Sequence, residues 1–229
     1  MKIKILYEDN HLLVVEKPIN IPVQSDSSQD EDLLSLLKNE IKEKYNKPGN
    51  VYLGLVHRLD RPVGGVMVFA KTSKAASRLS DQVRKNELKK TYLAVVENPF
   101  LESTGAYNDY LYKDSKTNTS KVVSKDHKDA KFASLDYQVL DTRENLSLID
   151  VHLHTGRSHQ IRVQFASHAH PLWGDARYNP RSNSTQQIAL WASQLTLTHP
   201  TTKEEMTFTS EVPKRYPYTL FELVQEKQI

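Results

Sequence analysis

One carboxylate lies between two arginines in the first third of this 229-residue chain. The segment HRLD at residues 57–60 is followed by RPVGG at 61–65 and by a compact apolar run at 66–70. Positive side chains favour the ionised form of the Asp60 carboxylate, and a constrained loop beside a strand is a common position for catalytic groups. Taken alone, the segment is more typical of a structural ion pair at the end of a loop.

A second segment, KKTY at residues 89–92, leads into an expected strand. A tyrosine at the start of a strand can place its ring in a cleft, either to stack on a base or to offer its hydroxyl. Taken alone, Tyr92 is more typical of an ordinary strand aromatic beside the solvated lysines Lys89 and Lys90.

The third segment, TGRSHQIR at residues 155–162, puts two arginines, a histidine and a glutamine around a glycine turn. Helical spacing predicts that Ser158, His159 and Arg162 share one face. The amides of the first helical turn, together with Arg157, are suited to hold a phosphate. A polar helix cap with surface charges is the alternative, and we favour the functional interpretation.

The fourth segment, PLWGDARY at residues 171–178, mixes apolar and polar residues. It is expected either to line a site or to pack over the preceding helix, and packing is favoured for Trp173. The nearby histidines lack a third ligand at diagnostic spacing, so we expect no metal site. The four histidines considered are His152, His154, His168 and His170.

Composition limits the possible classes of protein. Apolar residues make up 38% and charged residues 26% of the chain, which is typical of a soluble globular protein. The chain has no cysteine, which excludes disulfides and a thiolate nucleophile. We expect no membrane span and no secretory signal, hence a cytoplasmic location.

Charge is distributed unevenly along the chain. Residues 51–100 contain nine basic and four acidic side chains, whereas residues 1–50 contain seven basic and nine acidic side chains. A locally basic segment in a chain of net charge +3 fits a polyanion bound on one face. A solvated helix face explains the same pattern about equally well.

The elements that must position these residues follow from periodicity and turn signals. We expect two strands around a turn at residues 9–10, a helix from 33 to 45 after a capping box of Ser28 and Glu31, and a helix capped by Ser73. Residues 103–131 are interpreted as a surface excursion with a short strand at 122–123, and Ser158 is expected to cap a helix. Further strands are expected at 66–70, 91–97, 135–140, 146–153, 188–198 and 206–209, with a terminal helix at 218–226.

The pattern predicts an α+β fold with a mostly antiparallel, mixed sheet flanked by helices, forming one domain over residues 1–229.

Together, the four segments resemble the RluA-type pseudouridine synthases of ribosomal large-subunit RNA and tRNA. The resemblance covers about residues 5–210 and includes the opening YEDNHLLVVEKPINIPV. It implies that structured RNA is the partner, that no metal or nucleotide cofactor is needed, and that specific uridines are isomerised after base flipping. We also expect a monomer.

The resemblance also implies residue roles. Asp60 matches the catalytic aspartate, Tyr92 the tyrosine lying against the target base, and Arg162 the arginine that pairs with the carboxylate. Arg58 matches a residue that helps hold the site open, while Arg157 and His159 have less defined roles in their motif. Basic residues expected to contact RNA are Lys71, Lys89 and Lys90, with Arg84 and Lys85.

Two departures from the family pattern stand out. Relatives often have Thr-Ser before the glycine of the first motif, where this chain has Val63-Gly64-Gly65. Many relatives carry a small RNA-binding domain before the catalytic one, whereas here the match starts almost at residue 1. RNA selection is therefore expected to involve residues 25–50 and 103–131.

Two rival functions stay open at this point. A nucleoside or sugar hydrolase would use Asp60, but such enzymes usually need a second opposed carboxylate or a metal. A non-catalytic RNA-binding module is the other rival, and the joint presence of Asp60, Tyr92 and Arg162 argues against it. The sequence leaves open whether Asp60 attacks C1′ or removes a proton from C2′.

Overall fold

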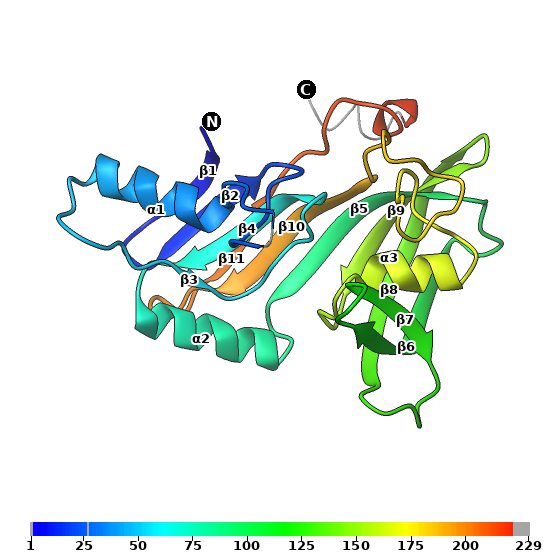
Figure 1. Cartoon of the computed structure of the whole chain (residues 1–229), viewed down its shortest axis with the longest axis horizontal. Helices are drawn as coiled ribbons and strands as arrows, with labels where there is room; N and C mark the ends of the chain where they lie inside the picture. Colours follow the sequence, from blue (N-terminus) through cyan, green and yellow to red (C-terminus); the bar gives the residue numbers. More distant parts are fainter. Residues whose placement is uncertain (1, 27, 222–229) are drawn as a thin grey trace. The chain divides into compact units, whose positions relative to one another are not determined.

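The computed structural model describes residues 2–26 and 28–221, and the chain forms two compact units (Figure 1). Unit 1 consists of Met1–Lys89 and Ala192–Glu211, and unit 2 of Lys90–Trp191 and Val212–Ile229. Each unit combines antiparallel strands with helices, which confirms the α+β class. That the two units act as one domain stays a prediction.

Unit 1 is built on a buried strand, β4 (Gly64–Ala70), in which every residue is closed to solvent. Antiparallel pairing joins β1 to β2, β2 to β4 and the short β3 to β4. The last two strands, β10 and β11, form an antiparallel hairpin. Their bounds are Lys4–Glu8 for β1, Leu12–Lys17 for β2, Gly54–Leu55 for β3, Leu190–Thr198 for β10 and Glu205–Thr209 for β11.

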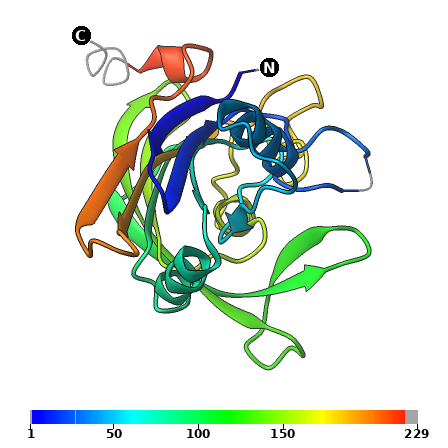
Figure 2. The ribbon, with the colours of Figure 1, turned by 90° about the vertical axis from the view of Figure 1, so that its left-hand side faces the viewer.

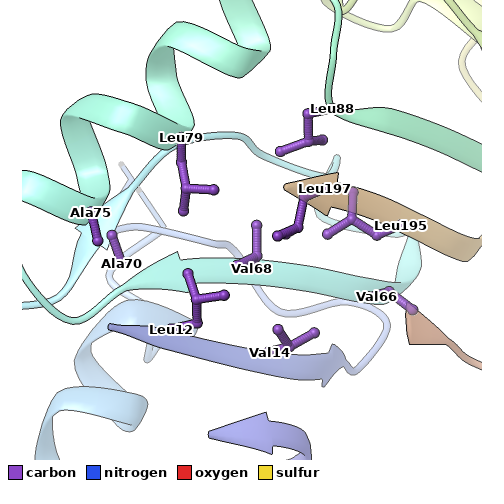
Figure 3. Packing of buried hydrophobic residues seen from close by; sticks show 10 residues of the cluster. All are labelled: Leu12, Val14, Val66, Val68, Ala70, Ala75, Leu79, Leu88, Leu195 and Leu197. Atoms are coloured by element: carbon purple, nitrogen blue, oxygen red, sulfur yellow. The ribbon is translucent and has the colours of Figure 1, made fainter. Parts of the chain in front are cut away.

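Helix α2 (Ser73–Arg84) covers one face of these strands (Figure 3). Its Ala75 and Leu79 are buried and pack in one cluster with strand residues. The side chain of Gln82 adds two hydrogen bonds to the backbone of Thr198, at 2.7 and 2.9 Å. The strand members of the cluster are Leu12, Val14, Val66, Val68, Ala70, Leu195 and Leu197.

The caps of the first two helices differ from the expectation. Helix α1 (Leu33–Lys44) begins after Asp32, whose carboxylate accepts a 3.0 Å hydrogen bond from the amide of Ser35, so the capping box of Ser28 and Glu31 was wrong. Helix α2 is capped by Thr72 rather than by Ser73. Aspartate and threonine satisfy the free amides as well as serine does, and sequence alone places such ends only to within a residue or a few.

Unit 2 is built on a second antiparallel array, in the order β5-β9-β8-β6-β7. One helix, α3 (Gln160–Ser167), contributes Val163 to a small core with Leu111 and Ala133. The 3-10 turn η1 (Tyr218–Leu220) occupies part of the expected terminal helix, and residues 222–226 of that expectation lie outside the described residues. The strands are β5 (Lys89–Glu97), β6 (Thr104–Asp114), β7 (Thr119–Val123), β8 (Lys131–Arg143) and β9 (Leu146–Leu153).

The interpretation of residues 103–131 as a surface excursion was wrong for the most part, although the short strand expected at 122–123 is confirmed as the end of β7. Residues 104–123 form the long strand β6, a tight turn and β7, and Figure 2 shows this hairpin as an extended ribbon (green). The polar residues hid the strands because only one face of the hairpin is buried, through Leu111 and Ser120. A half-buried strand rich in lysine and aspartate alternates too weakly to be recognised by hydropathy.

Candidate active site

Asp60 lies in the loop between β3 and β4 and is half-buried. Its carbonyl accepts a 2.9 Å hydrogen bond from the amide of Val63, so the residue starts a tight turn. Gly65, just inside β4, has a φ of +116°, and a Cβ there would lie 2.2 Å from the carbonyl oxygen of Ala192. Only glycine allows this close approach, which fixes where the loop enters the strand.

A fully buried lysine anchors this loop. The ammonium of Lys17, at the end of β2, donates hydrogen bonds to the carbonyls of Pro18 (3.0 Å), Arg61 (3.0 Å) and Val63 (2.7 Å). Three carbonyls match the three donors of an ammonium. Burial lowers the pKa of Lys17 to about 7, while the negative charge of Asp60 acts in the opposite direction. Lys17 therefore ties the end of β2 to the loop that carries Asp60.

The two arginines beside Asp60 have different surroundings. Arg61 forms an ion pair with Asp30 and a hydrogen bond with Ser28, and both arginine and aspartate are largely exposed. Arg58 is exposed and makes no ion pair with a described residue. His57 accepts a 3.1 Å hydrogen bond from the amide of Val68, which ties the HRLD segment to β4.

Tyr92 lies on β5 in unit 2 and is only 6% exposed. Lys90 is two residues earlier on the same face of the strand, and burial lowers the pKa of its ammonium. A Cβ added to Gly156 would lie 3.3 Å from this ammonium nitrogen, so Lys90 approaches the glycine turn of TGRSHQIR. The second and third sequence segments therefore meet within unit 2.

Arg162 lies on α3 and forms a bidentate ion pair with Asp175. The Nε atom is 2.8 Å from one carboxylate oxygen and a terminal nitrogen is 2.7 Å from the other. The side chains of Arg162 and Asp175 are 7% and 1% exposed. The fourth segment therefore packs against α3 through a charge pair, in which Asp175 is a functional residue that its sequence motif did not reveal.

Tyr178 extends this arrangement. Its ring lies 5.2 Å from the guanidinium carbon of Arg162, and its hydroxyl accepts a 2.8 Å hydrogen bond from the amide of Ser120. The same hydroxyl is 2.8 Å from Nδ1 of His159. Burial raises the pKa of Tyr178. Residues of β7, α3 and the loop after α3 thus fix the plane of the Arg162 guanidinium.

The start of α3 also differs from the expectation. His159 is the N-terminal cap and has a left-handed backbone (φ 53°), so Ser158 lies before the helix and does not cap it. No side chain caps the first amides of α3. The side-chain oxygen of Gln160 instead closes the turn before the helix, where it accepts hydrogen bonds from the amide of Arg157 (3.0 Å) and the hydroxyl of Thr155 (2.7 Å). A glutamine that closes its own turn is hard to distinguish from an ordinary helical residue in a sequence.

The remaining basic residues lie in separate settings. Arg157 is exposed, and its Nε donates to the carbonyl of Phe132 at 2.9 Å. Lys71 is 12% exposed and pairs with Glu8 at 2.7 Å, whereas Lys89 is exposed and 3.5 Å from Glu205. Arg84 and Lys85 both pair with Asp81 on α2.

The described part of the chain contains no cluster of three potential metal-ligating side chains. No helix among residues 2–26 and 28–221 is long and apolar enough to cross a membrane.

Comparisons with known proteins agree with these motifs. A family model described as RNA pseudouridylate synthase matches residues 11–167. The chain is 35% identical over 204 residues to the uncharacterized RNA pseudouridine synthase YhcT of Bacillus subtilis (strain 168), covering 89% of this chain and 66% of that protein. It is 32% identical over 224 residues to ribosomal large subunit pseudouridine synthase D of Zymomonas mobilis, covering 93% of this chain and 70% of the relative.

A solved structure also matches. Human RNA Pseudouridylate Synthase Domain Containing 4 gives a TM-score of 0.78 at 23% identity, covering 95% of this chain and 91% of that one. At 23% identity this match shows that the two proteins share a fold.

Proposed function

Because the chain belongs to the RluA-type family of RNA pseudouridine synthases, which are isomerases, we propose that it converts specific uridines of rRNA or tRNA to pseudouridine, with Asp60 as the catalytic carboxylate. The observation that carries the proposal is the span of the family match. Residues 11–167 include HRLD, KKTY and TGRSHQIR in order. We also propose that the protein acts as a monomer in the cytoplasm, where these RNAs lie.

The reaction moves one glycosidic bond. The N1–C1′ bond breaks, the base turns over, C5 bonds to C1′, and the proton on C5 is lost while N1 gains one. Asp60 either attacks C1′ or removes the proton from C2′, and both routes need an ionised carboxylate close to the ribose. No oxidant or reductant enters this balance, and we propose that no cofactor takes part.

Residues of the other motifs act around the same nucleotide. Arg162 stabilises the negative charge of Asp60 during the reaction. The two hydrogen bonds to Asp175 hold the Arg162 guanidinium in one orientation within unit 2. Tyr92 stacks on the base or relays the C5 proton, since a phenol with a pKa of about 10 is a weak base at neutral pH. Arg58, Arg157 and His159 contact the flipped nucleotide, and Lys71, Lys89 and Lys90 its backbone.

The target uridine is hidden in stacked RNA, so it must be flipped out at a cost of a few kcal/mol. Basic side chains that bind phosphates offset this cost. Affinity for RNA should then fall steeply with salt, by about a thousandfold between about 50 and 200 mM if roughly six phosphates are contacted. An affinity that stays flat over this range contradicts the phosphate contacts.

The target can be identified by mapping pseudouridine across total RNA from cells with and without the gene. The proposal expects at least one position in rRNA or tRNA to lose its modification and to regain it with the wild-type gene but not with Asp60→Asn. Rescue by Asp60→Asn would support a non-catalytic RNA-binding role. Release of free uracil from RNA by the purified protein would support a hydrolase.

A further inference from the structure

The β6–β7 hairpin has one face that the fold of unit 2 leaves open. Leu111 and Ala133 point toward α3, where they pack with Val163. Alternation along a strand places the neighbouring residues on the opposite face. Cross-strand register joins Tyr110 to Val123 and to Phe132, and Tyr112 to Lys121. We call these five residues the outer hairpin face.

Aromatic rings occupy much of the outer hairpin face. Phe132 is 43% exposed, and its ring lies edge-on to Tyr110 with centroids 5.6 Å apart. Tyr112 is half-buried, and its ring centroid is 4.7 Å from that of His127. Exposed rings on a sheet offer stacking platforms for unpaired bases, with little dependence on base identity.

Positive charge lies on this face and in the turns beside it. By the same alternation Lys121 lies on the outer hairpin face, Lys116, Lys125 and Lys128 lie in the adjoining turns, and Lys113 and Lys131 lie on the side of Leu111. Six lysines lie between residues 113 and 131, and all six are exposed. None of their ammonium groups pairs with a residue in the described part of the chain. The same stretch contains three acids, Asp114, Asp126 and Asp129, which leaves a net charge of +3. The lysines are Lys113, Lys116, Lys121, Lys125, Lys128 and Lys131.

We propose that the outer hairpin face binds a single-stranded stretch of the substrate RNA, through stacking of bases on Phe132 and Tyr110 and phosphate contacts by Lys121 and the lysines of the adjoining turns. The inference rests on the proposed function for the identity of the RNA. Unstacked RNA presents the faces of its bases and its phosphates. The aromatic rings can stack on the bases, and the lysines, which form no ion pair in the described part of the chain, can bind the phosphates. A second copy of the same face is disfavoured as the occupant because its lysines repel their equivalents.

The test uses two full-length variants with the same change in charge and in ring count. Phe132→Ala with Lys121→Glu alters the outer hairpin face. Tyr52→Ala with Lys214→Glu alters an exposed ring and an exposed lysine elsewhere, and serves as the matched control. The probe is a fluorescein-labelled oligouridine of about 12 nucleotides, within the usual footprint of such surfaces.

Anisotropy titrations should show at least about tenfold weaker binding for the hairpin variant and no change for the control. The slope of log Kd against log salt should fall by about one for each lysine lost. The charge-only variant Lys121→Glu with Lys125→Glu should show the slope change with its thermal unfolding midpoint retained, which separates binding from folding.

Binding and catalysis are measured separately, so the two proposals fail in different ways. If wild type forms pseudouridine but the hairpin variant binds and reacts like the control, the surface assignment is overturned alone. If wild type forms no pseudouridine while the hairpin variant loses oligouridine binding, the surface assignment stands and the reaction does not. Concentration-dependent self-association that the hairpin variant abolishes, with unchanged RNA binding, would assign the face to a protein partner instead.

Discussion

Asp175 holds the Arg162 guanidinium through two parallel hydrogen bonds of 2.7 and 2.8 Å, in a setting almost closed to solvent. The amide of Arg177 also donates to this carboxylate at 3.1 Å, so Asp175 is itself fixed in place. A buried bidentate pair of this kind sets the direction of a guanidinium more strictly than a single contact does.

Replacing Asp175 by asparagine should impair both folding and turnover. The substitution takes the charge of Asp175 away from the Arg162 guanidinium, and breaking a buried pair on one side costs about 3–5 kcal/mol. We expect a lower thermal midpoint and a reduced kcat at a temperature where the variant is still folded. Asp81→Asn, which removes an exposed partner of Arg84 and Lys85 on α2, is the control and should change neither. Equal kcat for both variants would show that the pair has no part in positioning Arg162.

Lys17→Met should lower kcat while changing KM for RNA little. The carbonyls of Arg61 and Val63 lose their donor, so the loop that carries Asp60 is no longer anchored. Lys4→Met is a fair control because the Lys4 ammonium is exposed and pairs with Glu16. Single-turnover rates at saturating RNA measure the effect, and equal rates for the two variants would contradict the anchoring role.

Acid stability should depend on Glu8. Burial by itself would raise the pKa of Glu8, but hydrogen bonds from Lys44, Lys71 and Tyr45 overcome it and lower the pKa from 4.5 to about 2. Between these values the unfolded chain binds more protons, so the free energy of unfolding should decline as the pH falls from about 4.5 toward 2, by about 3 kcal/mol at most.

Urea unfolding of wild type and Glu8→Gln over this pH range isolates that contribution. Other carboxylates contribute equally to both proteins, so the difference between the two curves should shrink as the pH drops. Parallel curves would mean that the lysine contacts of Glu8 do not favour its ionised form.

The sequence predicted the parts of the fold in which the spacing of apolar residues clearly follows either a helix or a strand. The apolar run before Lys17, the buried strand at residues 66–70 and the helix at 33–45 all formed near their expected places. Apart from the short strand at 122–123, the β6–β7 hairpin was missed because its lysines and aspartates mask a half-buried alternation.

The candidate site shows a similar division. The resemblance to the RluA-type family pointed to Asp60, Tyr92 and Arg162, and the family match over residues 11–167 covers the segments that contain them. Lys17 and Asp175 were missed because each acts through a partner distant in sequence: Lys17 on the carbonyl of Val63, 46 residues away, and Asp175 on Arg162. The role of a buried charged residue can be recognised only when its hydrogen-bond partners are known.

The central claim is that Asp60 carries an isomerisation, and tritium release from RNA labelled at C5 of uridine tests it most directly. Purified wild type should release tritium to water and leave pseudouridine in RNA that has lost no base, whereas Asp60→Asn, which keeps the shape and loses the charge, should release none above background. Tritium release by Asp60→Asn at the wild-type rate, or loss of the base as free uracil, would contradict the account.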